Sequence, residues 1–307
     1  MTNTGPKHDM LRGSLAALGA TLFWSGNFII ASGLGPKVPP VQLAFYRWLI
    51  AVVVFTPFIA RSAWAHRRLL RRHLPYLALT GFIGVTIFNT LVYTAGRTTT
   101  ALNLSLISMS NPLFLALLSR IVFGERFTRQ KALGTAIVIF GLIFLITGGS
   151  PTRLLDLTLT VGDLWMLLAA FLFAVYSILI KRKPDGMPVL VLQYGTFAIG
   201  LLLLLPIYLI SRAAQPPVAW DTAGLLSLAY VGIFASLVAF YLWSQALLEI
   251  GPTRAGLIYY SGPVFSGLGA ALVLGQPIGA VQIVSMVAII LGLLIATGAL
   301  SFLPRPL

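Results

Sequence analysis

The chain has 307 residues, of which 58% are hydrophobic and 9% are charged, and its mean hydropathy is +0.94. A soluble globular domain carries roughly 25% charged residues because water must wet its surface. This composition therefore excludes a soluble domain, and it also excludes collagen, a coiled coil and a disordered chain. The sequence predicts an all-α integral membrane protein, and the lack of cysteine excludes disulfides and thiol chemistry.

The formal net charge of +14 could suggest a nucleic-acid partner. The basic residues, however, interrupt long apolar runs instead of gathering on one polar face. In membrane proteins, Lys and Arg in the loops set the orientation of the chain. We therefore expect no nucleic-acid partner, and we use the basic residues to predict topology.

Ten apolar runs are long enough to cross a bilayer, whose core of about 30 Å takes roughly 20 helical residues. The predicted spans are residues 11–33, 41–60, 75–95, 101–123, 130–147, 162–180, 189–211, 222–247, 253–274 and 279–301. The first run is longer than the core of a signal peptide, which has roughly 7–15 residues. We therefore expect it to be retained as a span.

The distribution of Lys and Arg between the connecting segments predicts the orientation. If the N-terminus is cytoplasmic, the inside segments hold sixteen of these residues and the outside segments hold four. Because cytoplasmic loops carry the excess of positive charge, this asymmetry places both termini in the cytoplasm. We expect a multi-pass protein of the bacterial inner membrane, with its basic clusters also meeting anionic lipid.

The chain repeats itself when it is shifted by 151 residues, so that residues 111–149 fall on residues 262–300 without a gap. The matched pairs include Pro112 with Pro263, Gly124 with Gly275, and Gly141 with Gly292. One Pro and two Gly in a single register are not expected from apolar composition alone. The sequence thus predicts two five-span repeats, residues 1–150 and 151–307.

An odd number of spans in each half makes the second repeat cross the membrane in the opposite direction to the first. Inverted repeats recur in alternating-access carriers, which bind their substrate near mid-membrane where the repeats meet. Pro112 and Pro263 sit at equivalent points of spans four and nine, where proline interrupts helical hydrogen bonding. Such paired interruptions predict the transport site. The alternatives are a duplication without functional meaning and kinks that only let the helices curve.

The uncharged polar and aromatic residues inside the predicted spans are the candidate substrate-binding residues. They are Trp24, Asn27, Asn89, Tyr93, Ser108, Asn111, Tyr176, Tyr241, Ser244, Gln245, Tyr259 and Tyr260. Rings with a few amide and hydroxyl groups suit a neutral or zwitterionic solute that has an apolar side chain. The alternative for Asn and Ser is hydrogen bonding between helices, and for Tyr93 and Tyr259 it is packing or a place at the membrane interface.

All seven acidic residues and all three histidines lie in predicted loops or near span ends. Carriers coupled to protons or sodium use buried carboxylates, because only a titratable group can exchange a cation for a substrate. We therefore expect transport without proton exchange at a mid-membrane carboxylate. We also expect no metal, no cofactor and no catalytic residue.

Arg47 is the one basic residue well inside a predicted span, near the outer end of the second. Its long side chain can reach the outer interface, or it can pair with Asp163 on the same predicted side. Contact with a substrate carboxylate is the remaining possibility. The sequence otherwise places no Lys or Arg at mid-depth, which argues against multiply charged phosphates and sugar nucleotides as substrates.

Several short segments carry a family resemblance. They are Trp24-Ser25-Gly26-Asn27, Phe45-Tyr46-Arg47-Trp48, the stretch from Asn111-Pro112 to Gly124-Glu125-Arg126, and its echo from Gly262-Pro263 to Gly275. These segments resemble the ten-span EamA-type carriers of the drug/metabolite transporter superfamily, and most closely the YddG-type aromatic amino-acid exporters. The second copy departs from the family pattern at Gln276, where Glu is usual.

The resemblance implies ten helices around a central cavity lined by spans 1, 3, 4, 6, 8 and 9. It also implies export of amino acids such as phenylalanine, threonine and methionine. We therefore predict a secondary carrier that exports neutral amino acids or similar small metabolites by alternating access. The alternatives are another substrate class on the same fold (a drug, sugar, nucleoside or lipid-linked sugar), a passive channel and an intramembrane enzyme. The sequence leaves the oligomeric state open, a monomer included.

Overall fold

In the computed structural model, the regular structure of the described residues is helical throughout. The structure describes residues 6–34, 38–98, 107–150, 152, 160–215, 218, 220–274 and 278–298. The α-helices are α1 (Pro6–Leu34), α2 (Pro40–Ala65), α3 (Arg67–Arg72), α4 (Leu74–Gly81), α5 (Phe88–Ala95), α7 (Asn111–Phe123), α8 (Arg129–Ile146), α9 (Val161–Lys181), α10 (Val189–Ala213), α11 (Thr222–Tyr230), α12 (Ala239–Ile250), α13 (Pro252–Tyr259), α14 (Gly262–Leu274) and α15 (Ala280–Thr297). Two π-helical segments are η1 (Phe82–Ile87), between α4 and α5, and η3 (Val231–Val238), between α11 and α12.

The helices lie where the apolar runs predict them, and their ends differ from the predicted ones by a few residues. Six segments of the described chain are long and apolar enough to cross a membrane. They are Pro40–Ala65, Leu74–Ala95, Val161–Lys181, Val189–Ala213, Thr222–Ile250 and Ala280–Thr297. Helix α7 is apolar but shorter, and residues 101–106 of the predicted fourth span and 275–277 of the repeat lie outside the described residues. The count of ten spans therefore stays a prediction.

The interruptions predicted at the two prolines are confirmed. Helix α7 begins at Asn111 with Pro112 in its first turn. In the second half, α13 ends before α14 begins at Gly262, which is followed by Pro263. Proline suits a first turn because its missing N–H would have no helical partner there. Helix α13, which precedes the second interruption, packs against the start of α7. A Cβ on Gly256 of α13 would stand 3.4 Å from the Cα of Pro112.

The sequence does not predict the two π-helical segments. A π-helix bonds each N–H to the carbonyl five residues earlier, which widens the turn, and such segments are frequent at functional sites. A carbonyl of each segment also accepts from a polar side chain five residues later, from Asn89 on α5 for η1 and from Ser236 for η3. Asn89 Nδ2 reaches the carbonyl of Gly84 at 3.4 Å, and Ser236 Oγ reaches that of Val231 at 2.8 Å.

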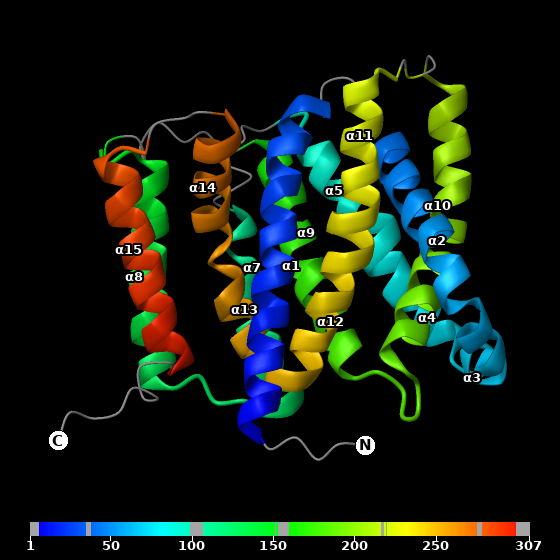
Figure 1. The fold of residues 1–307 in the computed structure, drawn as a ribbon, viewed down its shortest axis with the longest axis horizontal. Coiled ribbons are helices and arrows are strands. Elements are labelled where there is room, and N and C mark those ends of the chain that lie inside the picture. Colours follow the sequence, from blue (N-terminus) through cyan, green and yellow to red (C-terminus); the bar gives the residue numbers. More distant parts are fainter. Residues whose placement is uncertain are drawn as a thin grey trace.

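Helices α8 and α15 form a pair at one end of the molecule (Figure 1). Their backbones touch. A Cβ on Gly134 would stand 2.5 Å from the carbonyl oxygen of Gly292, and a Cβ on Gly292 would stand 2.7 Å from that of Gly134. Small residues allow this approach, which favours helix association in lipid, where apolar burial between helices gives little driving force.

The centre of the molecule is built around α1, α9 and α12. Helix α1 packs on α12, α13 and α14, while α9 packs on α5 and α7. Toward the other end of the row, α2 packs on α10 and on η3 (Figure 1). The first turn of α1 and the last turn of α15 lie at the same edge of the molecule, in keeping with termini predicted on one side.

Replacing Gly292 with Val will push α15 away from α8, because the added side chain has no room beside the Gly134 carbonyl. Overpacking of this kind costs about 1–3 kcal/mol, so we expect a lower melting temperature of the purified protein in detergent. Leu291→Val, one residue away at a 48% exposed position, is the matched control and should melt like the wild type. Wild-type melting of the Gly292 variant would show that the two backbones are not in contact.

Candidate functional site

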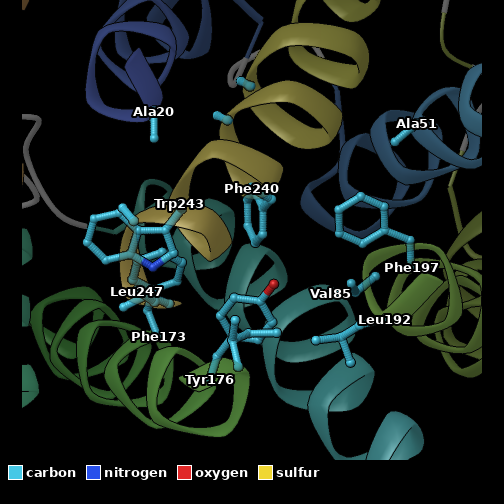
Figure 2. Close-up of a cluster of buried hydrophobic side chains, with 14 of the residues drawn as sticks. Ala20, Ala51, Val85, Phe173, Tyr176, Leu192, Phe197, Phe240, Trp243 and Leu247 are labelled. Carbon is cyan, nitrogen blue, oxygen red and sulfur yellow. The ribbon is translucent and has the colours of Figure 1, made fainter. Parts of the chain in front are cut away.

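Aromatic rings from four helices meet at the centre of the molecule. The ring centroid of Trp24 on α1 lies 5.4 Å from that of Phe173 on α9 and 5.9 Å from that of Tyr259 on α13. It lies 5.5 Å from the centroids of both Phe240 and Trp243 on α12. Figure 2 shows Phe173, Phe240 and Trp243 lying together between α9 and α12. We call these five residues the ring cluster.

Helical spacing explains why the rings of α9 and α12 converge. Residues three apart project from the same side of a helix, as do Phe173 and Tyr176, and Phe240 and Trp243. Tyr176 extends the ring cluster, because its centroid lies 5.7 Å from that of Phe240. Its ring rests on Gly84, where any Cβ would overlap it. Aromatic pairs of this kind contribute roughly 0.5–1.5 kcal/mol each beyond their buried area.

Hydrogen bonds hold these side chains in place. Trp24 Nε1 donates to the carbonyl oxygen of Ala235 in η3 at 2.9 Å. Trp243 Nε1 donates to Oγ of Ser177 at 2.9 Å, and Ser244 Oγ donates to Oε1 of Gln193 on α10 at 2.8 Å. The bond made by Ser244 agrees with the structural alternative, a hydrogen bond between helices.

The two helix interruptions are each tied to a neighbouring helix. Asn111 Nδ2, at the start of α7, donates to the carbonyl of Ala170 on α9 at 2.9 Å. At the second interruption, Ser25 Oγ on α1 donates to the carbonyl of Gly262 at 3.0 Å. Each bond runs between a helix interruption and the first helix of the opposite half.

Polar atoms at the interruptions also remain without partners. Asn111 Oδ1, Tyr260 Oη and Ser261 Oγ are buried and have no hydrogen-bond partner within the described part of the chain. Buried polar atoms are nearly always hydrogen bonded, so an unpaired one needs an explanation such as a bound water or ligand. The interruptions therefore offer unused acceptor and donor capacity in the interior.

Arg47 contradicts two of the predictions made for it. Its side chain is 2% exposed, so it does not reach an interface. Its Nε donates to Ser236 Oγ at 2.8 Å, and its Nη1 donates to Asn89 Oδ1 at 2.9 Å and to Tyr93 Oη at 2.7 Å. Acceptors on η3 and α5 hold the guanidinium inside.

Asp163 does not pair with Arg47. Its Oδ2 instead accepts from the backbone N–H of Thr160 at 2.6 Å in a capping box that begins α9. As predicted, the described acidic residues lie in the first or last turn of a helix, at its cap or between helices. They are Asp9, Glu125, Asp163, Asp185, Asp221 and Glu249.

The remaining candidates are spread over other places. Tyr241 and Gln245 are half-buried on α12 and bond each other, with Gln245 Nε2 2.8 Å from Tyr241 Oη. Ser108 is buried just before α7. The side chain of Asn27 lies outside the described part of the structure. The structure thus brings some of the candidates together. Trp24, Tyr176 and Tyr259 meet at or beside the ring cluster, Asn111 and Tyr260 lie at the interruptions, and Asn89 and Tyr93 contact Arg47.

Sequence reasoning missed Phe173, Phe240, Trp243 and Ser236. Phe173 and Phe240 carry no polar group, but the three-residue spacings of Phe173 with Tyr176 and of Phe240 with Trp243 mark common helix faces. Ser236 gave no signal, because its role depends on Arg47, which lies 189 residues away in the chain.

A separate hollow of about 630 Å³ opens at the end of α9, away from the ring cluster. It is lined by Tyr76, Leu179, Lys181, Arg182, Lys183, Pro184 and Asp185. Lys181 Nζ donates to the carbonyl of Leu248 and Lys183 Nζ to that of Met187. Two of its cations are thus engaged with the backbone.

Comparison with known proteins identifies the family. The model of the EamA-like transporter family matches the chain twice, over residues 11–147 and 160–298. An uncharacterised transporter of Archaeoglobus fulgidus is 30% identical, with 83% of this chain and 86% of the relative covered. The uncharacterised transporter YyaM of Bacillus subtilis is 27% identical, with 92% of each chain covered. A probable amino-acid metabolite efflux pump of Salmonella typhimurium is 26% identical, with 91% of this chain and 92% of the relative covered.

A solved crystal structure shares the fold. It superimposes with a TM-score of 0.76 at 21% identity, covering 95% of this chain and 99% of the other. The family match covers nearly all of the described residues and includes both halves. The chain therefore belongs to the EamA-like transporter family of the drug/metabolite transporter superfamily and is a multi-pass helical membrane protein.

Proposed function

We propose that the chain is a secondary carrier that exports neutral amino acids, or similar small metabolites, by alternating access. It consists of two inverted five-helix repeats, residues 1–150 and 151–307, which cross the membrane ten times in all. Both termini are cytoplasmic, and the membrane is the bacterial inner membrane. The orientation follows from the excess of Lys and Arg in the segments on the side of the termini.

Corresponding features of the two halves support the repeat. The family model matches each half separately. Within the described residues, each half has a π-helical segment in its third predicted span and an interruption in its fourth. Helix contacts are also exchanged between the halves, since α1 packs on α12 and α14, while α9 packs on α5 and α7. A pseudo-twofold axis in the membrane plane produces this pattern of contacts.

The observation that carries the proposal is the pair of interruptions with their unpaired polar atoms. Asn111 Oδ1 and Ser261 Oγ, one from each half, are buried without partners in the described structure. Interrupted helices in corresponding positions mark the binding site in carriers of this architecture. The site would bind the polar end of a solute there and its apolar end against the ring cluster.

The aromatic surroundings favour a solute with an apolar or aromatic side chain. Tyr259 belongs to the ring cluster and directly precedes the interruption at residues 260–261, so rings and unpaired polar atoms are neighbours in the chain. Trp24 contacts Tyr259 from α1. The Salmonella relative, described as a probable amino-acid metabolite efflux pump, is consistent with amino acids as the substrate class.

Purified protein in liposomes should exchange labelled phenylalanine for unlabelled phenylalanine at equal pH on both sides, with saturation. The reason is that the described carboxylates lie at helix ends or between helices, so none is placed to carry a proton through the centre. Counterflow measures this exchange. Exchange that requires a pH difference would refute transport without proton coupling. Flux without saturation would indicate a channel. Exchange of sugars or nucleosides alone would indicate another substrate class.

Trp24→Leu should lower the preference for phenylalanine over leucine by about 2- to 10-fold, because it removes the ring that the other four contact. Competition for counterflow measures the preference. Trp64→Leu, at a 70% exposed tryptophan on α2, is the matched control and should keep it. An unchanged preference in the Trp24 variant would place the substrate away from the ring cluster.

A further inference from the structure

Within the described residues, the guanidinium of Arg47 is an interior cation that no carboxylate contacts. Its partners in the described structure are the side chains of Ser236, Asn89 and Tyr93 and the carbonyl oxygen of Ala235, all of them neutral. Burying a charge is costly, and buried cations are usually paired with a carboxylate. Neutral dipoles hold this side chain in position, and no carboxylate of the described residues neutralises its positive charge.

The hydrogen bonds of Arg47 are unevenly distributed around the guanidinium, which has five N–H groups. Nε and Nη1 are saturated by Ser236, Asn89 and Tyr93 at 2.7–2.9 Å. Nη2 has two N–H groups and only one contact, at 3.4 Å to the carbonyl oxygen of Ala235. The Nη2 edge is therefore the part of Arg47 that can still bind an acceptor.

The free edge of Arg47 adjoins the ring cluster. The same carbonyl oxygen of Ala235 accepts from Trp24 Nε1 at 2.9 Å, so Trp24 and Nη2 of Arg47 approach one atom from two sides. A solute that places an anionic group at Nη2 would have its neighbouring apolar group against Trp24. An α-amino acid carries its carboxylate and its side chain on one carbon, which is the spacing that this arrangement fits.

We propose that the Nη2 edge of Arg47 binds the carboxylate of the transported solute, an inference that rests on the proposed carrier function. Charge-assisted hydrogen bonds between arginine and a carboxylate are among the strong ones, and the guanidinium fork matches the planar group. The carboxylate supplies the charge that the surroundings of Arg47 lack. The substrate class is therefore solutes with a free carboxylate beside an apolar group.

Asn89 and Ser236 are positioning residues for this group. Each accepts a hydrogen bond from Arg47 and donates to a carbonyl of a π-helical segment, Asn89 on α5 to Gly84 in η1 and Ser236 to Val231 within η3. The two segments come from the two proposed repeats. Arg47 thus joins η3 to α5, and its Nη2 lies 3.4 Å from the carbonyl oxygen of Ala235.

Arg47 could instead only join helices, and a comparison of acid and amide separates the two roles. In wild-type proteoliposomes, phenylalanine should compete for counterflow better than phenylalaninamide, its neutral-amide analogue. Arg47→Gln should lower this acid-over-amide ratio about tenfold or more, because a hydrogen bond to a charged group is lost. Arg182→Gln, which removes an exposed arginine at the end of α9, is the matched control and should leave the ratio unchanged. A purely structural Arg47 would lower both competitors equally.

Melting of the purified protein with phenylacetate tests binding without transport. Phenylacetate should raise the melting temperature of the wild type and of Arg182→Gln but not of Arg47→Gln. Arg47→Lys, which keeps the charge, should retain part of the shift and serves where the Gln variant does not fold. No acid preference and no phenylacetate shift in a wild type that exchanges amino acids would overturn the role of Arg47 and leave the carrier intact. A phenylacetate shift that depends on Arg47, without amino-acid exchange, would support the carboxylate site and overturn amino-acid transport.

Discussion

In apolar surroundings each backbone N–H and C=O needs a partner inside the protein, and this constraint decides where polar chemistry can lie in the chain. The described spans depart from the α-helix at η1, at η3 and at the interruptions before Asn111 and Gly262. A polar side chain stands at or beside each departure, Asn89 and Ser236 at the π-helical segments and Asn111 and Ser261 at the interruptions. The ring cluster joins two of these places, because Trp24 bonds to η3 and contacts the last residue of α13. Polar side chains of the described spans thus stand where the regular α-helical hydrogen bonding is interrupted.

The proposed repeats keep one packing shape while exchanging the residues that make it. Tyr176 on α9 lays its ring on Gly84, and Tyr230 at the end of α11 lays its ring on Gly26 of α1, where it also bonds to a backbone carbonyl at 3.1 Å. In the first pair the ring comes from the sixth predicted span, and in the second it comes from the eighth. Each contact pairs a tyrosine ring with a glycine, but the tyrosine lies on the first span of its half in one contact and on the third span of its half in the other. Protein cores tolerate exchanges that keep the total side-chain volume. This exchange hides the repeat in these spans, whereas Pro112 and Pro263 preserve it in register.

Much of the fold follows from the sequence, because length and apolarity predict a membrane helix and the matched pair Pro112 and Pro263 predicts the two interruptions. Proline alone is not sufficient, since Pro57 and Pro206 lie inside continuous helices. The π-helical segments cannot be predicted from the sequence, because no residue type marks where they begin or end. The backbone at the edges of η1 is also ordinary, since Gly81 and Phe88 have α-helical dihedral angles. Burial of Arg47 was missed for a related reason. Its acceptors lie 42, 46 and 189 residues away, and only the rotation of α2 about its axis decides whether the guanidinium faces them or the interface. Of the rings in the ring cluster, the polar positions of the spans predict Trp24 and Tyr259, whereas Phe173, Phe240 and Trp243 emerge only from the packing of α9 and α12.

The neutrality of the acceptors around Arg47 agrees with the proposed role of this side chain as a carboxylate site. An acidic partner would neutralise the guanidinium, and a substrate carboxylate would then have to displace it, leaving a second buried charge unpaired at a cost of about 3–5 kcal/mol. Ser236, Asn89 and Tyr93 orient Arg47 without neutralising it, so a carboxylate can bind and leave without exposing a buried anion of the protein.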